Sequence, residues 1–203
     1  MAAGTVLAFW AVALVLIVVP GPDWAFTLSA GLRGRSVLPA VGGLVLGYAA
    51  ITTIVAVGVG AIVARSPAIL TSLSVIGGAY LTWQGAMSFF NPATPSTDMP
   101  TGSAWSTFVR GFGVSGLNPK GLLIFLALLP QFTDPDMTWP ISVQIGILGL
   151  LFTVTCALFY TCLGSVTRFV LRARPAAARV VGRVSGAAMI AIGITLIVER
   201  LFT

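Results

Sequence analysis

Two charged side chains, Asp23 and Lys120, lie within long apolar stretches of the sequence. Asp23 ends the motif PGPD at 20–23, and Lys120 ends the motif NPK at 118–120, so each charge directly follows a proline. Proline interrupts a helix, and a charge inside a membrane costs from about 2.5 kcal/mol upward. Two proline-interrupted apolar segments in corresponding parts of a membrane chain are typical of a transport site. The sequence therefore predicts that both charges belong to such a site.

The first motif predicts a helix that stops and restarts. Pro20 interrupts the incoming helix, Gly21 can cap a new half-helix, and Pro22 suits the first position of that half-helix. Asp23 then falls in the first turn, where the positive end of the helix dipole favours a carboxylate. We expect Gly21, Pro22 and Asp23 to form one side of the site.

The second motif predicts another restart. Asn118 is a natural N-cap, Pro119 again takes the first position, and Lys120 follows. A cation is unfavourable at that end of a helix, so Lys120 needs an anion, which is either Asp23 or an anionic group of the substrate. Gln84 is a further candidate for the site, because an amide so deep in an apolar segment needs several hydrogen-bond partners. The alternative is that the two charges pair only to hold the halves of the chain together.

The composition indicates a membrane protein. The chain is 57% hydrophobic and 8% charged, with a mean hydropathy of +1.02, whereas a soluble domain carries about 25% charged residues. The net charge of +6 does not indicate a nucleic-acid partner, because the arginines gather between the hydrophobic stretches, as topology signals do. The chain has no histidine, and its two cysteines have neither redox nor metal-ligand spacing. We therefore expect no metal site, no cofactor and no enzymatic activity.

The hydrophobic pattern predicts an all-α, polytopic membrane protein that forms a single domain over 1–203. Six segments are long enough to cross a bilayer. They are 5–30, 36–64, 67–90, 105–130, 139–165 and 180–200. Three spans per half is an odd number, so the halves 1–90 and 105–203 are expected to enter the membrane in opposite senses, as an inverted repeat with broken first and fourth helices.

The distribution of charged loops predicts the orientation. Arg33 and Arg35 lie between the first two spans, the segment 168–179 carries further arginines, and the loop at 134–136 is acidic. The positive-inside rule then places the arginine-bearing loops and the Pro/Ser/Thr-rich linker 91–104 in the cytoplasm. Both termini are expected on the outer, periplasmic side.

The motifs together resemble a known family. PGPD at 20–23 is followed by GLRGR at 31–35 and by a glycine-rich second span at 42–47, and LNPKG at 117–121 is followed by LPQF at 129–132. This order is similar to that of the LysE/RhtB-type amino-acid exporters, and most similar to their homoserine/threonine branch. The resemblance covers the whole chain in length and order of segments.

The resemblance implies export of amino acids or close derivatives across the bacterial inner membrane, driven by the proton gradient. In the mechanism that we expect, the substrate ammonium approaches Asp23, and its carboxylate meets Lys120 and the amides of the half-helix that begins at Asn118. Asp23 would also carry the coupling proton, and one repeat would rock against the other. The partners are then an amino acid, protons and the bilayer. Small-residue spacings such as Gly43/Gly47 leave a homodimer possible.

Other functions fit the sequence less well. An exporter of metal ions or other small solutes of a related six-helix type is the alternative, but Asp23 is the only acid deep within a span and histidine is absent. A thiol–disulfide carrier needs neighbouring cysteines, and Cys156 and Cys162 are poorly placed for that role. A non-transporting scaffold would have no use for two buried charges at two helix breaks.

Overall fold

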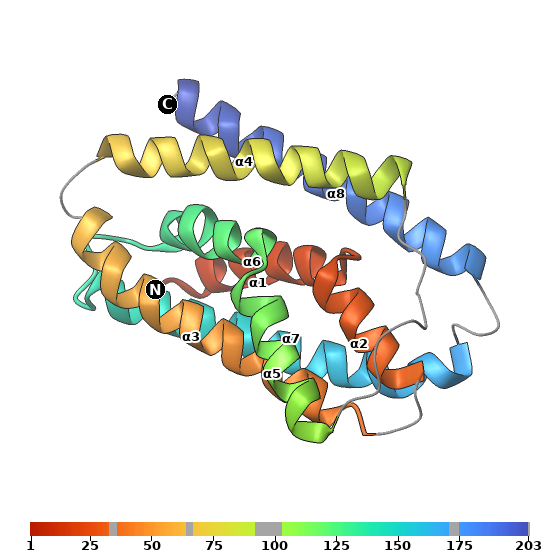
Figure 1. The fold of residues 1–203 in the computed structure, drawn as a ribbon. Coiled ribbons are helices and arrows are strands. Elements are labelled where there is room, and N and C mark those ends of the chain that lie inside the picture. Colours follow the sequence, from red (N-terminus) through yellow and green to blue (C-terminus); the bar gives the residue numbers. More distant parts are fainter. Residues whose placement is uncertain (33–35, 64–66, 92–102, 171–174, 203) are drawn as a thin grey trace.

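The computed structural model describes most of the chain, and every regular element in the described part is a helix (Figure 1). The residues outside the description are 33–35, 64–66, 92–102, 171–174 and 203. The predicted all-α class is thus confirmed. Most of the predicted linker 91–104 lies outside the described residues, and so do several arginines of the orientation argument, namely Arg33, Arg35, Arg65, Arg172 and Arg174.

The helices follow the predicted segments closely. They are α1 (Ala3–Val18), α2 (Pro22–Leu32), α3 (Leu38–Val63), α4 (Pro67–Phe90), α5 (Ala104–Gly116), α6 (Pro119–Leu123), the π-helix η1 (Ile124–Leu128), the 3-10 helix η2 (Leu129–Phe132), α7 (Ile141–Val170) and α8 (Pro175–Phe202). The predicted first segment is divided into α1 and α2, and the predicted fourth segment into α5, α6, η1 and η2.

Proline sets the start of four helices. Pro22, Pro67, Pro119 and Pro175 are the first residues of α2, α4, α6 and α8. Proline fits this position because the first N–H groups of a helix have no partner within it, and because its fixed φ already suits the helix. The two predicted breaks are confirmed: α1 and α2 meet at a bend of 60°, and α5 and the following half-helix meet at 48°.

The described helices are those of a multi-pass membrane protein. Leu38–Gly58 of α3 and Ile141–Thr167 of α7 are each long and apolar enough to cross a bilayer, and each bent pair would add a span, so the described residues hold two to four. In α8 the apolar stretch is the shorter Gly186–Glu199. The six-span inverted repeat therefore stays a prediction.

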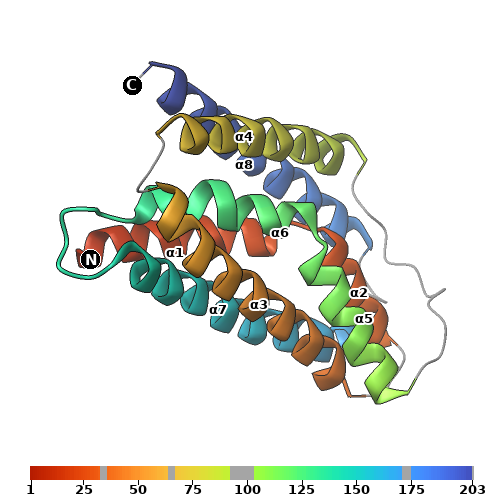
Figure 2. The ribbon, with the colours of Figure 1, turned by 60° about the vertical axis from the view of Figure 1, so that its left-hand side comes forward.

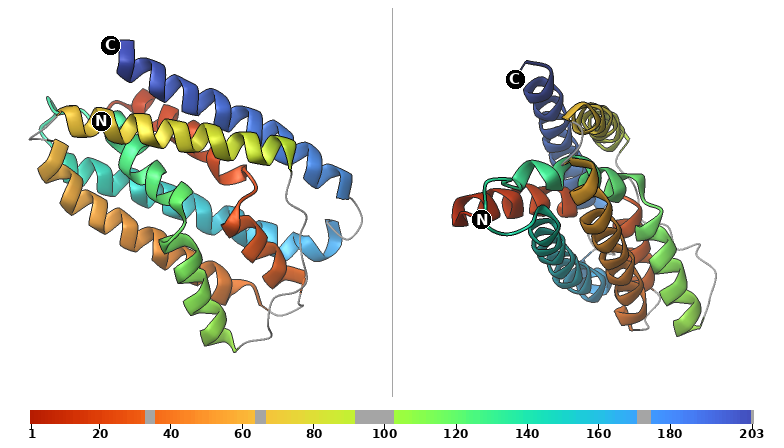
Figure 3. Two further views of the ribbon diagram at one scale, coloured as in Figure 1. Left: turned by 45° about the horizontal axis from the view of Figure 1, so that its top comes forward. Right: turned by 90° about the vertical axis from the view of Figure 1, so that its left-hand side faces the viewer.

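The half-helices α1 and α6 lie in the middle of the molecule. Helix α4 packs along α8 on one side, and α3 packs along both α5 and α7 on the other. Figures 1 and 2 show α1 and α6 between these two groups. The start of α1 and the end of α8 lie at the same end of the bundle, and α4 ends at the opposite one (Figures 1 and 3).

Glycines allow the α4–α8 pair to pack closely. A Cβ on Gly78 would lie 2.6 Å from the Gly193 carbonyl oxygen, and a Cβ on Gly85 would lie 2.7 Å from that of Gly186. Side chains at these positions would push the helices apart. Gly43 likewise lies against the backbone of α5. These glycines are used within one chain, so their spacing does not argue for a dimer.

The end of the second half-helix was not predicted. After α6 the chain widens into the π-helix η1, in which the Leu129 N–H donates to the Ile124 carbonyl, and then tightens into η2. Pro130 explains the change, because it has no N–H to continue an α-helical ladder. Beside it, the Gln131 side chain donates to the Ala127 carbonyl at 2.8 Å. A side chain thus bonds a carbonyl next to the place where the backbone pattern fails.

Candidate functional site

The first break has the predicted local structure. The Gly21 carbonyl accepts the Ala25 N–H at 2.9 Å, which is the first hydrogen bond of the new helix. Pro22 is the first residue of α2, and Asp23 lies in its first turn. The Asp23 side chain is 4% exposed, so its carboxylate is buried at the positive end of α2.

The second break also has its predicted local structure. The Asn118 side-chain oxygen accepts the Lys120 N–H at 3.1 Å, and the Asn118 carbonyl accepts the Leu122 N–H at 3.0 Å. Asn118 therefore caps α6, with Pro119 as the first helical residue. Both Asn118 and Lys120 are buried.

The Asp23 carboxylate joins the two breaks through hydrogen bonds. The Tyr48 hydroxyl of α3 donates to one carboxylate oxygen, and the Asn118 amide donates to the other at 3.3 Å. The Tyr160 hydroxyl of α7 also lies within hydrogen-bonding reach of this carboxylate. Asn118 thus caps one half-helix with its oxygen while its nitrogen holds the acid of the other.

Lys120 binds the end of α1 instead of pairing directly with Asp23, so its other predicted partner, an anionic group of the substrate, stays a prediction. The Lys120 ammonium donates to the Leu16 carbonyl at 2.7 Å and to the Val19 carbonyl at 3.3 Å, rather than to Asp23. In an uninterrupted helix the Leu16 carbonyl would accept the N–H of residue 20, but Pro20 has none. The ammonium takes that place, and the negative end of α1 favours it.

The two charges nevertheless occupy one buried centre. Asp23 and Lys120 lie within electrostatic range of each other. The Lys120 side chain is 6% exposed, so neither charge reaches a rim of the molecule. The structure brings together the last turn of α1 and the first turns of α2 and α6 at this centre. A small zwitterion has the two charges that could replace the present contacts of Asp23 and Lys120.

Gly21 and Gln84 border this centre. A Cβ on Gly21 would lie 3.8 Å from the Gln84 amide nitrogen and 3.9 Å from the Lys120 ammonium. The Gln84 amide oxygen is buried and has no hydrogen-bond partner in the described part of the chain. A buried acceptor without a donor costs about 1–3 kcal/mol, so this oxygen marks a place where a ligand donor would be welcome.

Several site residues were not selected from the sequence. Tyr48 is among them: its ring packs at centroid distances of 5.9 Å from Phe125 and 5.1 Å from Phe152, which fixes the hydroxyl on Asp23. Trp24 and Thr27 of α2 are also buried, with side-chain polar atoms that lack partners among the described residues. Thr27 could have been found, because it follows Asp23 by one helical turn.

Metal or thiol chemistry finds no support at this centre. Within the described ranges no three metal-ligating side chains gather. Cys156 is buried, Cys162 is exposed, and both are free. The groups that converge there are one carboxylate, one ammonium, two phenols, two amides and the single thiol of Cys156, and a lone thiol among charged and polar groups suits the recognition of a charged organic molecule.

Comparisons with known proteins agree with the motifs. The family model described as LysE type translocator matches residues 14–200. A membrane protein of Vibrio cholerae, named as uncharacterized, is 32% identical over 78% of this chain and 80% of its own length. A leucine efflux protein of Klebsiella pneumoniae is 27% identical over 78% of each chain. A cysteine/O-acetylserine efflux protein of Salmonella choleraesuis is 28% identical over 68% of this chain and 72% of its own.

No solved structure matches the chain. The family model, however, spans both half-helix breaks and all of the helices that carry the site residues. The relatives with named activities are efflux proteins, and the family is one of transporters rather than of enzymes. The chain belongs to the family of LysE-type translocators.

Proposed function

We propose that this protein exports amino acids or close derivatives across the bacterial inner membrane in exchange for protons. The observation that carries the proposal is the buried centre at which Asp23, Asn118 and Lys120 meet from two broken helices. Burying opposite charges so deep in a membrane protein costs free energy. The binding of a zwitterionic substrate would explain why this chain carries both. The relatives named for leucine and for cysteine/O-acetylserine efflux support an amino acid or a close derivative as the substrate class.

The substrate would bind by exchanging partners with the protein. Its ammonium group would approach Asp23 and displace the Tyr48 and Asn118 donors, and its carboxylate would take the Lys120 ammonium from the carbonyls of α1. The present contacts of Lys120 are neutral acceptors, and an ionised acceptor makes a hydrogen bond about twice as strong. The Gln84 amide nitrogen beside Gly21 would donate to the substrate carboxylate, and the unpartnered Gln84 oxygen would accept an N–H of the substrate.

Asp23 would couple the substrate to the proton. A carboxylate that binds a proton no longer attracts an ammonium group, so proton entry would release the substrate. The reverse exchange would reload the site. Two phenols and an amide around the carboxylate offer donors to its ionised form in the absence of substrate.

Two helix contacts fit an inverted repeat of 1–90 and 105–203, which we propose from the order of the spans and the two breaks. If the spans of the two halves are exchanged in order, α3 is exchanged with α7 and α4 with α8, so the α3–α7 and α4–α8 pairs map onto themselves. The half-helices are exchanged as α1 with α5 and α2 with α6. The packing of α3 on α5 then corresponds to the less extensive contact of α7 with α1.

Alternating access would follow from this arrangement, with one repeat rocking against the other and the linker 91–104 following the motion. The start of α1 and the end of α8 lie at the same end of the molecule, which agrees with a periplasmic location of both termini (Figures 1 and 2). The arginines at 33–35 and 168–179 would then face the cytoplasm.

The test is exchange in vesicles that contain the purified protein, loaded with labelled leucine, cysteine or O-acetylserine, with an imposed proton gradient. Asp23→Asn and Lys120→Ala should each abolish gradient-driven export. The control is Asp134→Asn, which changes an acid outside the proposed site. If both variants export at the wild-type rate, the site is wrong; if wild-type vesicles export no amino acid or derivative, the function is wrong.

A further inference from the structure

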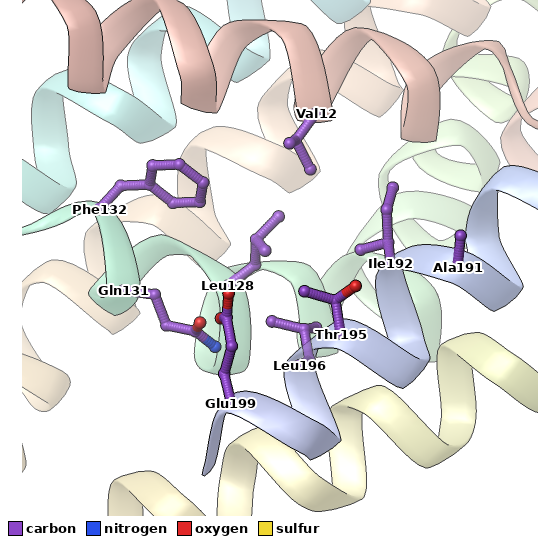
Figure 4. A pocket seen from close by; sticks show the side chains of 9 residues that line it. All are labelled: Val12, Leu128, Gln131, Phe132, Ala191, Ile192, Thr195, Leu196 and Glu199. Carbon is purple, nitrogen blue, oxygen red and sulfur yellow. The ribbon is translucent and has the colours of Figure 1, made fainter. Parts of the chain in front are cut away.

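A cavity separate from the buried charges lies toward the end of the bundle that carries both termini. Its volume is about 420 Å³, and α1, η1, η2 and α8 form its walls (Figure 4). Cavities of 300–1,000 Å³ are of the size that binds small molecules. The lining residues are Val12, Leu128, Gln131, Phe132, Ala191, Ile192, Thr195, Leu196 and Glu199.

The lining divides into an apolar wall and a polar side. Val12, Phe132 and Ile192 point into the cavity from three different elements (Figure 4). The polar side is made by Glu199 together with Thr195, one turn earlier on α8, and Gln131 of η2. One carboxylate beside an apolar wall suits a cation that carries an apolar body, and the Thr195 hydroxyl can serve a further polar group of it.

The cavity and the buried centre share two elements. Val12 precedes Leu16 by one turn of α1, which is about 6 Å along the helix, and the Leu16 carbonyl accepts the Lys120 ammonium. On the opposite wall, Leu128 follows Lys120 along the same half-helix. Val12 of the cavity wall thus lies one helical turn from the carbonyl that binds Lys120.

We propose that this cavity is a second binding site for the exported amino acid, with Glu199 taking the ammonium group and the apolar wall taking an apolar side chain such as that of leucine. It holds the substrate between the buried centre and the end of the molecule that bears the termini. The proposal rests on the proposed function, since it names a further site and the side-chain class for the same substrate.

The experiment measures protection of a cysteine in the cavity. Thr195→Cys is made with Cys162→Ser, which removes the exposed native thiol. The full-length protein in nanodiscs is alkylated with a water-soluble maleimide, with and without leucine. At a leucine concentration ten times the dissociation constant, mass action slows alkylation about tenfold. Ala191→Cys, also in the cavity wall, serves if Thr195→Cys does not fold.

Two comparisons make the result specific. Thr138→Cys gives an exposed thiol outside the cavity, and leucine should leave its alkylation unchanged. Adding Glu199→Gln to Thr195→Cys should remove the protection at the same leucine concentration, while Asp23→Asn should preserve it. Loss of protection in Asp23→Asn would mean that only the buried centre binds leucine, and the proposal would be overturned.

Leucine exchange by the wild-type protein in vesicles separates the two proposals. If leucine is exchanged but does not protect the cavity cysteine, the second site is wrong and the export function stands. If leucine is neither exchanged nor protective, the second site is wrong. The export function is then decided by whether the vesicles export cysteine or O-acetylserine.

Discussion

At the residue scale, the hydrogen bond from the Tyr48 hydroxyl to Asp23 can be tested by removing a single oxygen atom. Tyr48→Phe removes the donor to the carboxylate and keeps the ring between Phe125 and Phe152. A hydrogen bond to a charged group contributes about 1.5–3 kcal/mol, so its loss should slow vesicle export about tenfold or more. Tyr80→Phe changes a tyrosine on α4 that packs on Trp83, and it should export at the wild-type rate. Equal rates in both variants would show that the Asp23–Tyr48 contact is not used.

Gln84 offers a second test at this scale, because its amide oxygen is buried without a partner among the described residues. Gln84→Leu keeps a similar volume and removes that oxygen. If the amide served only structure, the melting temperature would fall and the KM would be unaffected. We expect instead a KM for the exported amino acid that is raised about tenfold, with no loss of thermal stability. Measuring both quantities on one preparation separates the two roles.

The residues of the two motifs could be predicted from their types, but their partners could not. Helix propensities and caps are local, so Gly21, Pro22, Asn118 and Pro119 were each placed correctly from neighbouring residues. The partner of Lys120 depends on tertiary packing. A sign of it was nevertheless present, because Pro20 leaves the Leu16 carbonyl without its usual donor.

At the scale of elements, the break between α1 and α2 and the position of Lys120 depend on each other. Pro20→Ala would supply the missing N–H, which can extend α1 by donating to the Leu16 carbonyl. Lys120 would then lose its closest acceptor. We expect export to fall at least tenfold, because the Lys120 ammonium is then no longer held at the end of α1.

The matched control for Pro20→Ala is Pro39→Ala, in the first turn of α3, where no helix is interrupted. It should leave both export and melting temperature close to those of the wild type. Full export by Pro20→Ala would mean that the break is not needed for transport.

The irregular end of the second half-helix could be predicted only in part from the sequence. Pro130 predicts that the α-helical pattern ends there, but the sequence did not predict the π-helix that precedes Pro130.

At the scale of the whole molecule, six spans could be proposed from hydropathy, whereas the pairing of the spans required the helix contacts. Sequence similarity between the halves is limited to the two breaks. The packing of α3 on α7 and of α4 on α8 is a property of the three-dimensional structure. The proposed inverted repeat predicts a topology that can be measured, because three spans in each half must place both termini on one side and the linker on the other.

Cysteine accessibility in intact cells tests this topology. With Cys162 replaced by serine, Ala2→Cys and Thr203→Cys should react with a membrane-impermeant maleimide added outside the cytoplasmic membrane, and Ser96→Cys should react only after the membrane is opened. The reason is the arginine-rich segments, which favour the cytoplasm and lie on the same side as the linker in the predicted order. Labelling of Ser96→Cys in intact cells together with the termini would exclude an odd number of spans per half. The two broken helices would then enter from the same side, and the opposed dipoles on which the zwitterion site depends could not form.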